Sequence, residues 1–213
     1  MAERRGRSVA PPSAYLDGRA SRWAATHESL VRAARCLFSN HGYRATTVNQ
    51  IASLAGVSER TFFLHFPSKR DVLFDLPGEN IDDFGQLVAE VGPEFDDLAA
   101  IQRAMTEWHT KRGDQKARHS LFCHLIDAAE SDPMLRTSMF DYNQALVDAA
   151  ANGLAKRRGE PGPGPSPTSV MTAAIAMRIY RLIVQEWARS DPHSFAAVAD
   201  RQFRLLRQIM RSH

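Results

Sequence analysis

Several features that define other protein classes are scarce in this sequence. Its 213 residues include only two cysteines, Cys36 and Cys123, which lie far apart within apolar stretches. Two thiols build neither a disulfide framework nor a four-ligand metal site, so we expect two buried, unpaired side chains in a reducing, cytoplasmic compartment. No run of about 18 apolar residues is present, as a membrane span would require, and residues 1–20 lack the apolar segment of a secretory signal. We therefore expect no membrane partner.

The motifs of common enzyme classes are also missing. The sequence contains no glycine-rich phosphate loop, no HExxH motif and no GxSxG motif. Its histidines are scattered, and His109, His119 and His124 do not form a convincing set of metal ligands. We therefore expect a protein that is not an enzyme, with no catalytic residues, no metal and no cofactor. An all-helical enzyme with an unrecognised site is the main alternative.

The basic residues are unevenly distributed along the chain. Of the 27 lysines and arginines, 11 fall within residues 1–75, against 6 of the 24 aspartates and glutamates, so this part carries a net charge of +5 and the remainder −2. A basic first third joined to a mildly acidic remainder favours contact between the first third and a polyanion. Arg4, Arg5 and Arg7 belong to a segment, residues 1–20, that reads as a flexible basic arm.

Local signals in the first third predict short, capped helices. An apolar stripe at spacings of three and four begins at Leu30 and ends at Phe38. Thr47 and Gln50 have the spacing of a capping box at the start of a second helix. Gly56 suits a turn that needs a positive φ, and Ser58 can cap the helix that follows. Two short helices around such a turn fit a helix-turn-helix.

The rest of the chain also predicts helices and no strands. Apolar residues recur at helical spacing from Asp97 to about His109, from Lys116 to Ala129 and from Pro133 to Arg158, and two further helices follow the proline- and glycine-rich loop before Thr168. We therefore predict an all-α fold of nine to ten helices. A three-helix DNA-binding domain at residues 21–76 precedes a larger helical domain at 77–213.

The residues around the predicted turn resemble a known family. Their order and spacing over about Arg22 to Leu76 are similar to the DNA-binding domain of the tetracycline-repressor (TetR) family of transcriptional regulators. The matching positions are Ala33, Ala34, Leu37, Phe38, Gly42, Tyr43, Thr46, Thr47, Val48, Ile51, Ala52, Ala55, Gly56, Val57, Ser58, Thr61, Phe63, His65, Phe66, Ser68 and Lys69. Phe63 departs from the pattern, because the family usually has a tyrosine there whose hydroxyl touches a phosphate.

The resemblance implies roles for individual residues. Five positions match residues that hold the DNA phosphates: Tyr43, Thr47, Thr61, His65 and Lys69. Ser58 and Arg60 match positions that reach base edges, and an arginine can bond to both O6 and N7 of guanine. The simpler alternatives are that Thr47 and Ser58 only cap helices, that His65 is structural, that Arg60 is only solvated, and that Phe62, Phe63 and Phe66 are mostly core.

The resemblance also implies that the C-terminal helices bind an effector and form a homodimer. The effector would be a small molecule of unknown identity, and apolar candidates for its site favour a hydrophobic or amphipathic compound. These candidates are Trp108, Phe122, Met139, Tyr142, Asn143, Met171 and Arg178, with Arg178 placed to pair with an acidic group. Candidates for the dimer contact are Ile175, Ile179, Leu182, Ile183, Leu205, Leu206 and Ile209.

The expected function follows from these two implied domains. We expect a repressor that binds a palindromic operator in double-stranded DNA as a dimer and is released by its ligand. A helix beginning at Ser68 would couple the two domains. The alternative within the same class is a constitutive DNA-binding protein without an effector, whose middle helices serve only as a scaffold.

Overall fold

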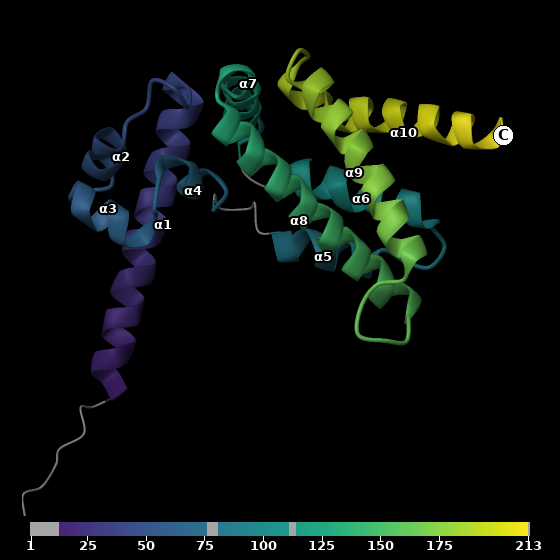
Figure 1. The fold of residues 1–213 in the computed structure, drawn as a ribbon, viewed down its shortest axis with the longest axis horizontal. Helices are drawn as coiled ribbons and strands as arrows, with labels where there is room; N and C mark the ends of the chain where they lie inside the picture. Colours follow the sequence, from purple (N-terminus) through teal and green to yellow (C-terminus); the bar gives the residue numbers. More distant parts are fainter. Residues whose placement is uncertain (1–12, 76–80, 111–113, 213) are drawn as a thin grey trace, which may run out of the picture.

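The molecule is built from helices, as predicted. The computed structural model describes residues 13–75, 81–110 and 114–212, and within these ranges it contains ten α-helices and one short 3-10 helix. Figure 1 shows two groups: α1 to α4 lie together at one end, and α5 to α10 form a larger body. The last helix, α10, extends at the end of the body opposite α2 and α3.

The N-terminal group consists of one long helix and three short ones. Their bounds are α1 (Ser13–His41), α2 (Val48–Leu54), α3 (Glu59–His65) and α4 (Lys69–Leu73). The first helix begins at Ser13, whereas the sequence predicted a start near Ser21. Most of the predicted arm, residues 1–12 with its three arginines, lies outside the described residues.

The body contains the remaining elements. Its helices are α5 (Ile81–Glu90), α6 (Asp97–Thr110), α7 (Gln115–Ser131), α8 (Pro133–Arg158), α9 (Pro167–Trp187), η1 (Pro192–Ser194) and α10 (Phe195–Arg211). The sequence analysis did not predict α5. Within the described ranges, no helix is both long and apolar enough to cross a membrane.

The two helices α5 and α8 cross unusually closely because each has a glycine at the contact. A Cβ atom added to Gly153 would lie 2.5 Å from the Gly85 carbonyl oxygen, and one added to Gly85 would lie 2.8 Å from the Ala149 carbonyl oxygen. Both separations are below 3.0 Å, a distance from a neighbouring atom that Cβ atoms in proteins essentially never show. Gly85 lowers the intrinsic helix propensity of α5, so packing on α8, rather than local sequence, stabilises this short helix.

We expect the substitution Gly153→Ala to destabilise the protein by about 1–3 kcal/mol, the usual range for overpacking a tight contact. The added methyl group forces the backbones of α5 and α8 apart. Urea unfolding followed by circular dichroism measures the change in the free energy of unfolding. Gly164→Ala is the control, because nothing lies within 4 Å of its added Cβ. Equal stability of the two variants would contradict the close crossing.

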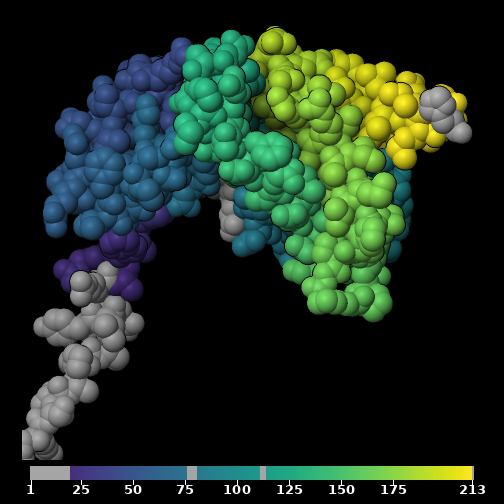
Figure 2. Space-filling view, viewed as in Figure 1, coloured from purple at the N-terminus to yellow at the C-terminus, as the bar shows by residue number. Residues whose placement is uncertain are grey.

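Two hydrophobic cores meet at α7. The body core contains buried side chains of α5, α6, α8, α9 and α10. The second core, which we call the shared core, joins buried residues of α1 to α4 to Leu121, Leu125, Ala128 and Ala129 of α7 and to Leu135 of α8. In Figure 2, α7 (teal-green) fills the space between the N-terminal helices (purple to blue) and α9 (yellow-green). The N-terminal helices are therefore packed directly onto the body.

The cysteines differ from the prediction of two buried thiols. Cys36 is exposed and Cys123 is only half-buried, and both are free. The Cys123 thiol donates a hydrogen bond to the Ala188 carbonyl oxygen at 3.2 Å, and burial raises its pKa. The apolar stretch around Cys36 misled the prediction, because this residue points away from the stripe of α1 that packs inward.

Candidate nucleic-acid interface and effector region

The turn between α2 and α3 has the predicted geometry. Gly56 has a φ of 73°, in the left-handed region that glycine tolerates best. Thr47 forms the predicted capping box at the start of α2: its side chain accepts a hydrogen bond from the Gln50 backbone, and the Gln50 side chain accepts one from the Thr47 backbone. Ser58 caps α3 by accepting a hydrogen bond from the Thr61 backbone at 3.1 Å. These bonds fix where both helices begin.

The first turn of α3 presents polar groups to solvent. Ser58 and Arg60 are exposed, and Thr61 is half-buried with its hydroxyl 2.9 Å from that of Ser58. Within the described ranges, Arg60 makes no hydrogen bond or ion pair, so its guanidinium is available to a ligand. Phe63 is also 53% exposed, and its ring meets the edge of the buried Phe62 ring. Of the three predicted core phenylalanines, only Phe62 and Phe66 are buried.

The Lys69 ammonium is already engaged by the protein. Its Nζ atom donates hydrogen bonds to the carbonyl oxygens of Tyr43 and Thr46, each at 2.7 Å, and lies 4.2 Å from the centroid of the Tyr43 ring. Burial lowers its pKa, while Asp132 opposes that shift. Lys69 thus holds the turn between α1 and α2 against α4. If a DNA phosphate binds here, the Lys69 ammonium has one N–H group left to donate to it.

Tyr43 belongs to the shared core rather than to the open surface. Its side chain is 5% exposed, and its ring packs against Phe38 with centroids 5.4 Å apart. Burial, reinforced by Asp132, raises the pKa of its hydroxyl to about 12, so the hydroxyl stays protonated. Any contact of Tyr43 with DNA must come from this hydroxyl, since the ring is covered.

His65 lies in an aromatic cluster that the sequence analysis missed. Its ring stacks on Trp23 of α1 with centroids 3.7 Å apart, and its Nδ1 atom is buried without a hydrogen-bond partner among the described residues. Burial and the nearby His27 lower the pKa of His65, while His27 pairs with Asp75. Trp23 and His27 are four residues apart, a spacing that places both on one face of a helix and could have revealed the cluster.

The N-terminal helices contact the body through α7 and α8. The Ser120 hydroxyl donates to the Ser39 carbonyl oxygen at 2.7 Å, and the His124 Nδ1 atom lies 3.1 Å from the Phe38 carbonyl oxygen. Both carbonyls belong to the last turns of α1. At the end of α4, the Phe74 ring lies 5.4 Å from the Tyr142 ring of α8. The predicted coupling through α4 therefore has a companion contact between α1 and α7.

The structure does not bring the predicted effector residues together. Trp108 is buried in the body core, and Phe122 and Tyr142 pack against that core. The others lie elsewhere: Met139 packs against the shared core, Asn143 is half-buried on α8, and Met171 and Arg178 are exposed on α9. Met171 and Arg178 share a helical stripe with Ile175 and Leu182, both exposed candidates for the dimer contact. Their assignment to an interior site was wrong, because periodicity defines a stripe but not whether it faces inward.

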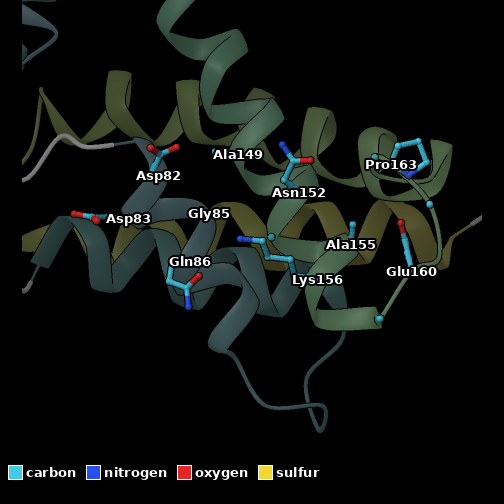
Figure 3. Close-up of a pocket in the computed structure, with 14 residues that line it drawn as sticks. Asp82, Asp83, Gly85, Gln86, Ala149, Asn152, Ala155, Lys156, Glu160 and Pro163 are labelled. Carbon is cyan, nitrogen blue, oxygen red and sulfur yellow. The ribbon is translucent and has the colours of Figure 1, made fainter.

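A pocket of about 730 Å³ lies at the surface of the body rather than in its interior. Figure 3 shows it between α5, α8 and the loop that follows α8, with Asp82, Gln86, Asn152 and Lys156 among its walls. None of the predicted effector residues lines it. The body core contains a small void lined by Phe84, Met105, Trp108, Leu146, Met177 and Tyr180, which has no room for a water molecule.

The three histidines that the sequence analysis considered as ligands serve separate contacts. The His109 Nε2 atom lies 2.8 Å from the Tyr180 hydroxyl, and the His119 Nε2 atom lies 3.0 Å from the Trp187 carbonyl oxygen. His124 contacts α1, as described above. Across the described ranges, no three histidine, cysteine or acidic side chains gather where they could hold a metal ion.

This fold and the capped, exposed α3 define a helix-turn-helix protein with an all-helical C-terminal domain. The chain belongs to the tetR family of bacterial regulatory proteins. The N-terminal domain of that family matches residues 30–76, and the MftR C-terminal domain matches residues 96–211. Members of this family are transcriptional regulators rather than enzymes, which confirms the expected class.

Individual relatives agree with this assignment. The chain is 26% identical over 129 residues to the HTH-type transcriptional repressor AcnR of Corynebacterium diphtheriae, covering 61% of this chain and 63% of that protein. It is 44% identical over 68 residues to the HTH-type transcriptional regulator TcmR of Streptomyces glaucescens, covering 32% and 30% of the two chains. The chain thus spans less than two thirds of the length of these curated relatives.

A solved structure shows the same fold at low identity. The transcriptional regulator FadR of Bacillus subtilis in complex with stearoyl-CoA superposes with a TM-score of 0.58 and 20% identity, covering 84% of this chain and 96% of that one. Such an identity supports a common arrangement of helices.

Proposed function

We propose that this protein is a dimeric transcriptional repressor of the cytoplasm that binds a palindromic DNA operator through α3 and is released by a small lipophilic effector. Its DNA-binding part would be residues 21–76 and its effector-binding and dimerising part residues 77–213. AcnR, to which this chain is similar over 129 residues, is named a repressor. This similarity supports repression over activation.

The DNA contact is proposed on the polar face around the turn. Ser58 and Arg60 project from the first turn of α3, where the recognition helix of such motifs meets base edges. Thr47, Thr61 and His65 would hold phosphates alongside them, and the Tyr43 hydroxyl and the remaining Lys69 donor would complete the set. Phe63 offers no hydroxyl, so one phosphate contact made by a tyrosine elsewhere in the family would be absent.

The dimer contact is proposed on α9 and α10. Four of the predicted contact residues, Ile175, Leu182, Leu205 and Ile209, are exposed together with Val170, Met171 and Met210. Large apolar side chains gathered on two neighbouring helices are typical of a protein interface. Ile183 is fully buried and Ile179 packs against the body core, so these two belong to the interior instead.

The observation that carries the proposed ligand response is the shared core. Leu121, Leu125 and Leu135 pack among the buried residues of α1 to α4, so a movement of α7 displaces the DNA-binding helices as well. A ligand acts only through its different affinity for the two arrangements, and about 1.4 kcal/mol of coupling weakens DNA binding tenfold. FadR of Bacillus subtilis, which has the same fold, was solved with stearoyl-CoA, and this supports a lipophilic effector.

A second function, constitutive DNA binding without an effector, has one observation in its favour. The void in the body core is closed, with no room for a water molecule. A closed void is expected both for a rigid scaffold and for an effector site that opens only when a ligand binds. The two differ in their response to ligands.

Selection from random duplexes tests the proposed function. The full-length protein is expected to enrich an inverted repeat whose half-site centres lie about 34–36 Å apart, one helical turn or a multiple of it. Binding of the selected duplex is then measured with and without a panel of lipophilic metabolites. Enrichment of no sequence would argue against an operator. Specific binding that no compound weakens would favour the constitutive alternative.

We expect Arg60→Ala to relax sequence preference at one base pair in each half-site. A bidentate contact to guanine contributes about 1–3 kcal/mol of discrimination, and Arg60 has no competing partner within the described ranges. Affinities of wild type and variant are compared on the selected operator, on operators substituted at each position, and on random duplex. If the variant loses the same affinity on specific and random DNA, Arg60 contacts only phosphate. Arg136→Ala, an exposed arginine on α8, is the control.

A further inference from the structure

The third helix leaves two large apolar side chains in contact with solvent. Phe63 is 53% exposed and Leu64 is 61% exposed, although α3 has only 7 residues. Single exposed apolar residues are common on protein surfaces and need no explanation. Two in succession on α3 call for one, because the second helix of a helix-turn-helix is the element that enters the major groove of DNA.

Leu64 points away from the interior of the N-terminal group. It lies two residues from each of Phe62 and Phe66, which are 0% and 3% exposed. Side chains two residues apart on a helix point in directions that differ by about 200°, at about 100° per residue. Leu64 therefore lies on the side of α3 opposite its buried face. In Figure 1, α3 is at the outer edge of the N-terminal group, on the side of α1 away from the body.

Leu64 shares this outer side of α3 with Arg60. The two residues are four apart, and side chains at that spacing are neighbours on a helix, with Cβ atoms about 5–6 Å apart. Both are exposed, and within the described ranges the Arg60 guanidinium makes no hydrogen bond or ion pair. The outer side of α3 thus presents a fork of N–H donors beside two methyl groups of leucine.

The floor of the major groove offers partners for both side chains. Guanine presents its O6 and N7 acceptors there, and thymine presents its 5-methyl group, which is recognised by apolar contact. At about 1.5 Å per residue α3 is about 10 Å long, whereas the groove is about 12 Å wide. Leu64, in the last turn of α3, therefore stays within the groove that Arg60 would enter. A thymine methyl group matches Leu64 as a guanine edge matches Arg60.

We propose that Leu64 recognises a thymine in each half-site by packing on its 5-methyl group, one or two base pairs from the guanine that Arg60 contacts. This inference rests on the proposed operator binding through α3 and names a base and an atom that it selects. The spacing follows from the Cβ separation of about 5–6 Å, which spans between one and two base-pair steps of about 3.4 Å. The ring of Phe63, held at 87° to the buried Phe62 ring, would flank this contact and exclude water from it.

Removal of single methyl groups from the DNA tests the inference without changing the protein. The full-length protein first selects its operator from random duplexes. Each thymine is then replaced in turn by deoxyuridine, which lacks only the 5-methyl group, and affinity is measured by fluorescence anisotropy. At one position we expect a loss of about three- to fivefold per half-site, and of about 10–20-fold with both half-sites substituted, as for one buried methyl group each. Deoxyuridine at the other thymines should have little effect.

Variants connect the sensitive methyl group to Leu64. Leu64→Ala withdraws the side chain and should bring the ratio of thymine to deoxyuridine affinity at that position to about one, whereas Leu64→Met keeps an apolar side chain and should preserve the ratio. Leu54→Ala is the matched control, because Leu54 is 55% exposed but belongs to α2, and its loss should leave the ratio unchanged. The ratio compares two duplexes on one protein, so a general loss of affinity cancels. Thermal unfolding verifies that each variant is folded.

Adding a methyl group back to a different base gives the complementary gain of affinity. At the sensitive position, a C·G pair in place of T·A lacks the methyl group, and 5-methylcytosine restores it at the same place in the groove. We expect wild type to bind the methylated C·G duplex about three- to fivefold more tightly than the unmethylated one. Leu64→Ala should bind the two equally. Equal binding by wild type would contradict recognition of the methyl group.

The outcomes separate the inference from the proposed function. A selected operator that tolerates deoxyuridine at every thymine would overturn the inference and leave operator binding standing. A methyl preference that survives in Leu64→Ala would assign it to another residue and also overturn the inference. If analytical ultracentrifugation then shows that Leu64→Ala changes the assembly state, the leucine lies in a contact between copies of the chain. A protein that enriches no sequence would overturn the proposed operator binding, and the recognition of thymine with it.

Discussion

Raising the salt concentration from about 50 to about 200 mM should weaken operator binding by about 10³–10⁵-fold if the dimer makes about 6–10 phosphate contacts. The reason is that residues 1–75 carry a net charge of +5, and cations released from DNA make each phosphate contact sensitive to salt. Equilibrium titrations by fluorescence anisotropy at several salt concentrations measure the slope. A slope near zero would exclude binding through phosphates.

The substitution Lys69→Ala refines this test. It is expected to weaken binding to all duplexes alike and to make the salt slope shallower if Lys69 also reaches a phosphate. Its two hydrogen bonds to the turn after α1 add a second effect, since their loss loosens the position of α2. The free energy of unfolding of the variant must therefore be measured beside its DNA affinity. An unchanged slope with lower stability would assign Lys69 a purely structural role.

The double substitution Ile175→Glu and Leu182→Glu should convert the dimer into a monomer and weaken operator binding by about 10²–10⁴-fold. Both side chains are exposed on one stripe of α9, where paired charges would oppose a twofold contact. The loss follows because two linked half-site contacts gain avidity that a single one lacks. Analytical ultracentrifugation gives the assembly state, and anisotropy gives the affinity.

Met134→Glu is the control for this prediction, since Met134 is also an exposed apolar residue but belongs to α8 rather than to α9 or α10. It should remain dimeric and bind the operator as the wild type does. A monomeric double variant that retains full affinity for the palindrome would contradict the need for a dimer. A double variant that remains dimeric would place the contact on another surface.

The sequence predicted best those features that depend on neighbouring residues. The capping box of Thr47 and Gln50, the positive φ of Gly56, the cap at Ser58 and the helix start at Ser68 are all present. Each involves a hydrogen bond or a backbone angle within a few residues, so spacing alone specifies it. The order of the helices was also predicted, because helical periodicity is a local pattern. The exception is α5, whose stability comes from packing Gly85 against α8, which is distant in the sequence.

Features that depend on which face of a helix is covered were predicted poorly. Arg178 and Met171 were placed in the interior, but they lie on the outer stripe of α9. Arg118 was not considered, because an arginine in an amphipathic helix is usually solvated. It is nevertheless 2% exposed, with its guanidinium against the rings of Trp108 on α6 and Phe122 on α7, and no local pattern in the sequence records that contact.

The shared core has a consequence for how this chain can be recombined. Because Leu121, Leu125 and Leu135 complete the hydrophobic interior of α1 to α4, the first 76 residues are not an interchangeable cassette. If they were grafted onto another regulator, the apolar residues of α1 to α4 that pack on α7 would face side chains that fit a different DNA-binding domain. A viable hybrid must also carry the face of α7 that packs on α1 to α4 and the first turn of α8, so operator specificity would be inherited together with a segment outside the helix-turn-helix.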